Sequence, residues 1–165
     1  MSLDILFSEE IFKNKMEKFC SGNDFESWLR FCDVSDWRFL KNDEDICLLG
    51  FAINSGSSVV VIVGNGGEIV QFLVQSSQEF KKDEKLPDNV STLLLKRNSE
   101  QLFGFWFIEE VEDVNVYSIK HIAQMRFLDQ TLFLDVICNL INESLDFERV
   151  VKNISSNTFE CENLS

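Results

Sequence analysis

The feature that most constrains this chain is a series of short apolar runs separated by connections of only a few residues. The runs occupy residues 37–40, 46–53, 59–63 and 68–75. Apolar or alternating runs of this length, bounded by turn residues, are typical of β-strands. A parallel crossover needs a dozen or more residues, so these short connections predict four strands in an antiparallel meander.

The glycine cluster at 64–67 (Gly-Asn-Gly-Gly) lies between the third and fourth runs. A phosphate-binding loop requires GxxxxGK[ST] or GxGxxG and leads into a helix. Here no Lys follows, and the next residues, EIVQFLVQ, have a strand pattern. The Asn-Gly pair therefore predicts a tight hairpin turn.

Helical patterns flank the strands. Residues 8–20 place apolar side chains near one face, and a second helix is predicted after Asp24, with Phe25, Trp28, Leu29 and Cys32 at i, i+3, i+4 and i+7. A third helix is predicted to end near Asn98, followed by strands at 102–110 and 116–125. Asp129 is predicted to cap a final helix whose apolar pairs recur every four residues.

These elements predict an α+β fold in the order α(α)-β-β-β-β-α-β-β-α. We expect an antiparallel sheet of about five to six strands with helices packed on it. The length fits one domain, which we place at residues 1–151. Residues 152–165 are polar and aperiodic, and we expect a disordered tail there.

The charge balance limits the partners. With 15 Lys and Arg against 28 Asp and Glu, the net charge is −13, which argues against nucleic acid and anionic lipid. It favours a solvated acidic surface or a basic partner. No apolar run reaches the length of a membrane-spanning helix. The N-terminal residues are acidic where a secretory signal peptide would carry Lys or Arg, and five cysteines without a CxxC pair suggest free thiols. We therefore expect a cytoplasmic protein.

The inventory of reactive side chains argues against an enzyme. His121 is the only histidine, so a zinc site with several His ligands is excluded, and no GxSxG motif is present. The acidic pairs lack the spacing of an EF-hand. We therefore predict no catalytic residue, no metal and no cofactor.

The aromatic residues provide the candidate binding site. In the run LFGFWFIEE, alternation places Phe105 and Phe107 on one face and Trp106 on the other. One face must pack under helices, and the other forms either a second buried layer or a partner surface. Since 16 Phe and 3 Trp are many for one small core, we take Trp106, Trp28, Phe105 and Phe107 as candidate partner-binding residues.

Residues 86–150 resemble the C-terminal half of the YbjN-type proteins, which are bacterial sensory-transduction-regulator-like proteins. The resemblance is carried by a short helix ending in LLKRN, by a strand with a glycine at Gly104, by a hairpin and by a long helix after Asp129. It implies the fold that this family shares with type III secretion chaperones. It also implies a protein that acts by binding a protein partner or a second copy of itself.

An alternative function is a small-molecule-binding protein or enzyme with a pocket between the sheet and the helices. Its polar groups would come from His121, Arg97, Arg126 and scattered acidic residues. A deep pocket joining these side chains would favour this alternative, whereas a flat apolar surface would favour a binding module.

Overall fold

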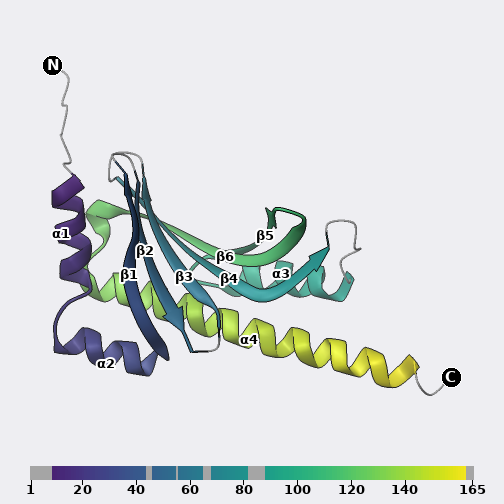
Figure 1. Ribbon diagram of the computed structural model, residues 1–165. Helices are drawn as coiled ribbons and strands as arrows, with labels where there is room; N and C mark the ends of the chain where they lie inside the picture. The colour runs from purple at the N-terminus through teal and green to yellow at the C-terminus, as the bar shows by residue number, and fades with distance from the viewer. Residues whose placement is uncertain (1–8, 44–45, 55, 65–67, 82–87, 163–165) are drawn as a thin grey trace.

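The structure is a computed structural model that describes residues 9–43, 46–54, 56–64, 68–81 and 88–162. Its helices lie on one side of a strongly twisted sheet, with the long C-terminal helix running behind the strands in Figure 1. The elements, in chain order, are α1 (Glu9–Phe19), α2 (Asn23–Phe31), β1 (Val34–Asp43), β2 (Ile46–Ile53), β3 (Ser58–Gly64), β4 (Ile69–Lys81), α3 (Asp88–Glu100), β5 (Phe105–Val111), β6 (Val114–Gln124), the short 3₁₀ helix η2 (Met125–Phe127) and α4 (Gln130–Glu162).

The sheet has six strands in the order β1-β2-β3-β4-β6-β5, and all neighbouring pairs are antiparallel. The predicted α+β class and the predicted meander of four strands are therefore confirmed. Strands β3 and β4 pair up to Gly64 opposite Ile69, so the chain reverses between them as a hairpin. Residues 65–67 of the predicted turn lie outside the described residues.

Strand β4 is longer than the strand predicted at residues 68–75. The strand continues to Lys81, with an irregularity in its pairing with β6 between Gln75 and Glu79. The buried carboxylate of Glu148 in α4 accepts hydrogen bonds from the backbone N of Ser77 (2.6 Å) and from Oγ of Ser57 (3.3 Å). These bonds hold the irregular segment against the core, and a short-range pattern of polar residues cannot indicate such a distant partner.

Helix α4 provides much of the core beneath the sheet. The ring of Phe133 lies 5.6 Å from that of Phe72 and 6.4 Å from that of Phe51, while Phe147 lies 4.3 Å from Trp106. The predicted cap of this helix is confirmed, because the backbone N of Leu132 donates to Oδ1 of Asp129 at 2.8 Å.

The C-terminal end of α4 differs from the sequence-based expectation. The helix was expected to end near residue 151, and the structure continues it to Glu162. Once a helix is nucleated, each added residue contributes one backbone hydrogen bond and no apolar periodicity is required. The polar composition of 152–162 therefore did not reveal the length of the helix.

Gly104 precedes strand β5 rather than lying within a strand, because β5 begins at Phe105. Its φ is +81°, and a Cβ at this position would lie 2.8 Å from Cδ2 of Leu140 and 3.0 Å from the carbonyl oxygen of Lys120. Both the left-handed backbone and the close approach favour glycine here. Gly104 thus lets the chain enter the sheet directly over α4.

The cysteine side chains that the structure describes, Cys20, Cys32 and Cys138, are free thiols. Burial raises the pKa of Cys20 to about 12. Burial, followed by the neighbouring Cys138 thiol, also raises the pKa of Cys32. The side chains of Cys47 and Cys161 lie outside the described residues.

None of the described helices is both long and apolar enough to cross a membrane.

Candidate functional site

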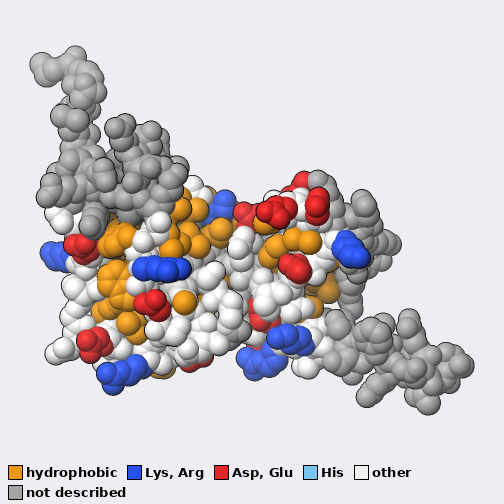
Figure 2. Space-filling model, in the orientation of Figure 1, with side chains coloured by type: hydrophobic (Ala, Val, Ile, Leu, Met, Phe, Trp, Pro, Cys, Tyr) orange, Lys and Arg blue, Asp and Glu red, His pale blue; other side chains and the backbone are white. Residues whose placement is uncertain are grey.

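The candidate site is the face of the sheet opposite to the helices, which we call the outer face. Alternate residues of each strand point to opposite faces, so the pairing register identifies its members. The outer-face residues used below are Arg38, Leu40, Leu48, Gly50, Val60, Ile62, Leu73, Phe105, Phe107, Lys120 and Ile122. Figure 2 shows orange side chains gathered over β1–β4 and, separately, near the β5–β6 end, with a blue side chain lying across the first group.

One row of the outer face crosses all six strands. In pairing order it consists of Arg38, Gly50, Val60, Leu73, Lys120 and Phe105. Neighbouring strands are spaced by about 4.8 Å, so the backbone positions of Arg38 and Lys120, four strand intervals apart, are separated by roughly 19 Å. The row therefore places a glycine and two aliphatic side chains between two cations.

The neighbouring row extends the apolar surface. Leu48, Ile62, Gln71 and Ile122 are partners along it. Ile122 is 50% exposed, Leu40 46% and Phe105 44%. Isolated exposed apolar residues are normal on any protein, whereas several exposed apolar residues gathered on one face mark a contact surface.

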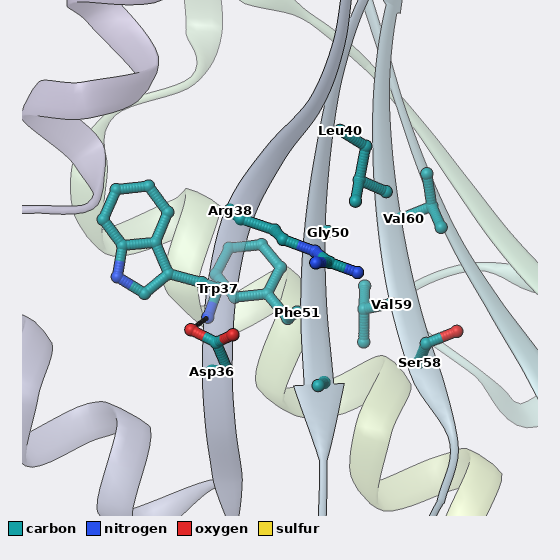
Figure 3. A pocket seen from close by; sticks show the side chains of 10 residues that line it. Asp36, Trp37, Arg38, Leu40, Gly50, Phe51, Ser58, Val59 and Val60 are labelled. Atoms are coloured by element: carbon teal, nitrogen blue, oxygen red, sulfur yellow. Dashed lines mark hydrogen bonds between the residues drawn. The ribbon is translucent and has the colours of Figure 1, made fainter.

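A hollow lies over Gly50, where the absence of a side chain leaves space on the outer face (Figure 3). A Cβ at Gly50 would lie 2.7 Å from Cδ1 of Leu40, so the leucine side chain partly fills the space that glycine leaves. Arg38 extends from β1 across β2, over Gly50. The hollow has a volume of about 320 Å³, and its lining includes Val60 and Ser58.

The described charged side chains of this face include the cations Arg38 and Lys120 and the carboxylates of Asp36 and Glu109. Asp36 lies beside Arg38 on β1, and its Oδ1 accepts a hydrogen bond from the backbone N of Trp37 at 2.8 Å. Within the described part of the chain, neither Arg38 nor Lys120 forms an ion pair. The Lys120 ammonium lies 5.1 Å from the centre of the Phe107 ring. The nearby carboxylate of Glu109 accepts hydrogen bonds from Nε2 of Gln75 (3.0 Å) and Oγ of Ser118 (3.1 Å). The two cations therefore remain available to a partner.

Trp106 is corrected from a candidate partner anchor to a core residue. Its side chain is 4% exposed, and its ring nitrogen Nε1 donates to Oε1 of Glu143 in α4 at 3.0 Å. The side chain of Asn98 in α3 donates to the backbone oxygen of Trp106 (3.0 Å) and accepts from its backbone N (2.6 Å). Helices α3 and α4 thus cover the face of β5 on which Trp106 lies.

The other three candidate residues separate into two places. Phe105 and Phe107 lie together on the outer face, with ring centres 6.1 Å apart. Trp28 is half-buried on the helix side, stacked on Phe25 at 5.6 Å and 6.0 Å from Phe51. The structure therefore brings together Phe105 and Phe107 and leaves Trp28 outside the site.

The sequence analysis missed most of the outer face, including Arg38, Val60, Leu73 and Ile122. A signal for it is present, because the central strands contain apolar residues at both odd and even positions, as in VVVIV and ICLLGFAI. A strand with one solvated face alternates between apolar and polar residues, and these runs do not. Two apolar faces could have been inferred from that departure.

The polar residues of the alternative function do not converge. His121 lies between Phe72 and Phe103, its Nδ1 accepts from the backbone N of Gly104 at 3.2 Å, and burial lowers its pKa. Arg97 joins α3 to α4 through Glu143 (2.6 Å) and Asp146 (2.7 Å). Arg126 lies over the ring of its neighbour Phe127 on the exposed turn after β6.

A second hollow, of about 360 Å³, lies beside the end of α3 and α4, and its lining includes Gln101, Asn139 and Asn142. His121 and Arg97 do not line it. Among the described residues, no group of three or more His, Cys, Asp or Glu side chains is placed to hold a metal ion.

Comparison of the chain with protein-family models and with curated proteins finds no match in either case.

Proposed function

We propose that this chain is a non-enzymatic protein-binding module, chaperone-like or regulatory, that contacts its partner through the outer face of the sheet. One observation carries the proposal. Helices cover one face of a six-stranded sheet. The other face, which no described helix covers, carries two groups of apolar side chains, one over β1–β4 and one near the β5–β6 end. Removing such a surface from water is the main source of favourable free energy in protein association.

The size of the face supports the same proposal. Six strands span five intervals of about 4.8 Å, and seven residues of strand extend about 23 Å, which gives a flat area of roughly 24 by 23 Å. Since side chains make the accessible area larger than the flat area, the face is of the order of the ~800 Å² that each partner contributes to a standard interface.

The resemblance of residues 86–150 to YbjN-type proteins supports a binding role as well. We also propose a cytoplasmic location, for which the free thiols of Cys20, Cys32 and Cys138 are the supporting observation. The partner in this proposal is another protein or a second copy of the chain.

Photo-crosslinking in the native cell tests the proposal. A photoreactive amino acid replaces Ile122 on the outer face in one variant and Leu95 on α3 in the other. Leu95 is a matched control, because it is an exposed aliphatic side chain on a helix. We expect a discrete adduct from position 122 and none from position 95. An adduct of twice the monomer mass would identify a second copy as the partner, and equal labelling at both positions would contradict the proposal.

A further inference from the structure

We propose that the outer face binds an acidic amphipathic segment of a partner protein, whose apolar side chains cover Val60 and Leu73 and whose carboxylates pair with Arg38 and Lys120. This inference rests on the proposed function and adds the chemistry of the partner. It differs from the expectation from net charge, which favours a solvated acidic surface or a basic partner.

The first step in the argument is the state of the two cations. The chain has 28 acidic residues, yet in the described part of it neither Arg38 nor Lys120 has a carboxylate partner. A partner that covers the apolar row also removes both cations from water. An unpaired charge that loses its water is costly, so a partner without carboxylates at these positions would bind poorly.

The second step is the geometry of the row. Arg38 and Lys120 stand on either side of Gly50, Val60 and Leu73, with a backbone separation of roughly 19 Å. A helix covers that length with about 13 residues and an extended strand with about six. One short segment can therefore place apolar side chains over the aliphatic residues and an acidic side chain at each end.

The third step is the range over which charge acts. At physiological salt the screening length is about 8 Å, so charges on the remote helices are largely screened from the centre of the face. Charges in direct contact are screened much less, and like charges placed opposite each other are unfavourable. The carboxylates of Asp36 and Glu109 on the same face already accept hydrogen bonds from the protein. Arg38 and Lys120 form no ion pair within the described residues, so we assign the sign of the preferred segment to these two cations, although the whole chain is acidic.

The hollow over Gly50 supplies a further point of contact. Arg38 extends across it, and its lining includes Leu40, Val60 and Asp36, whose carboxylate accepts a hydrogen bond from the backbone N of Trp37 (Figure 3). An apolar side chain of the segment that enters this hollow would bring a neighbouring carboxylate close to the Arg38 guanidinium. The same contact made by a basic segment would place two cations together.

Two fluorescent peptides test the inference on the full-length protein. Both have about 16 residues, long enough as helices to span the row, and both carry leucines on one face; one has glutamates beside the leucines and the other has lysines. Fluorescence anisotropy at about 0.15 M salt measures the two dissociation constants. We expect the acidic peptide to bind about tenfold more tightly, as two contact ion pairs would provide.

The variant pair Arg38→Glu and Lys120→Glu, made together, should reverse the preference between the peptides. The matched control is Arg30→Glu with Lys96→Glu, which reverses one arginine and one lysine at exposed positions on α2 and α3 and changes the net charge equally. The control should change both dissociation constants less than about twofold, since these remote charges are screened. If the glutamate variant does not melt cooperatively, Arg38→Gln with Lys120→Gln replaces it and should abolish the preference.

The outcomes separate this inference from the proposed function. Tighter binding of the basic peptide, or no binding of either peptide, overturns the inference, while crosslinking at position 122 decides the proposed function independently. If the wild-type protein sediments as a dimer and the glutamate variant as a monomer, a second copy occupies the face and the inference is overturned. The inference would also be overturned if the control variant, Arg30→Glu with Lys96→Glu, lost the preference for the acidic peptide to the same extent as the variant with Arg38 and Lys120 replaced.

Discussion

The two faces of the sheet are built from the same strands and have opposite environments. In β4, the inward residues Val70, Phe72 and Val74 are fully buried against α4 and its neighbours, while the outward residues Gln71 and Leu73 remain partly exposed. The inner face is covered by the chain's own helices, whereas none of the described helices covers the outer face, which carries apolar side chains and two cations. Along one strand, the inward residues therefore stabilise the fold. In our proposal, the outward residues that alternate with them bind the partner.

The neighbouring residues Phe72 and Leu73 should differ most in how much their replacement lowers the free energy of unfolding. Phe72→Ala removes a ring that is completely buried and lies 5.6 Å from Phe133, so it should lower the free energy of unfolding by about 3–5 kcal/mol. Leu73→Ala should cost less than half as much, because its partly exposed side chain leaves no closed cavity. Urea unfolding monitored by tryptophan fluorescence measures both. Equal losses in the free energy of unfolding would show that Leu73 on the outer face is packed as tightly as a core residue.

Asn98 tests how the inner face of β5 is closed. Asn98→Ala removes the donor and the acceptor that satisfy the backbone of Trp106, and we expect a loss of about 2 kcal/mol. Hydrogen exchange at the Trp106 amide should become faster in the same variant. The exposed neighbour Ser99, replaced by Ala, is the control, since its hydroxyl donates to the backbone carbonyl of Lys96 within the same helix. An unchanged stability would mean that water replaces the asparagine without cost.

His121 gives the inner face a pH dependence. Burial lowers its pKa in the folded protein, so below pH 6.5 the unfolded chain binds a proton that the folded chain does not. Stability contributed by the neutral ring is therefore complete above pH 6.5 and falls as the pH drops towards the folded pKa. The slope from one proton is at most about 1.4 kcal/mol per pH unit. Urea unfolding at several pH values should show this component in the wild type, and its persistence in His121→Phe would assign it to another group.

The smallest effect is expected on the outer face itself. Ile122→Ser removes an exposed aliphatic side chain and should change the free energy of unfolding by no more than about 0.5 kcal/mol. Binding of the acidic peptide should weaken at the same time, because apolar contact area is lost. Thermal unfolding and anisotropy on one sample measure the two effects. A large loss of stability without a change in binding would reverse the roles that we give to the two faces.

Much of the fold could be predicted from local patterns. The meander follows from the short connections, and the cap at Asp129 follows from one residue type before an amphipathic run. The extension of β4 to Lys81 could not be predicted, because it depends on pairing with β6 and on Glu148, which is distant in sequence. Trp106 was misplaced for a similar reason: alternation shows which residues share a face and does not show which face α3 and α4 cover.

The sequence by itself determined the strands, their antiparallel order along the meander and the presence of apolar residues on both of their faces. These are local properties, set by the length of each run and by the two-residue repeat of the pleat. Only the tertiary structure decided that Arg38, Val60, Leu73 and Lys120 form one row. That row depends on the register of successive strand pairs, and a shift of one residue in any pair would move a side chain to the opposite face.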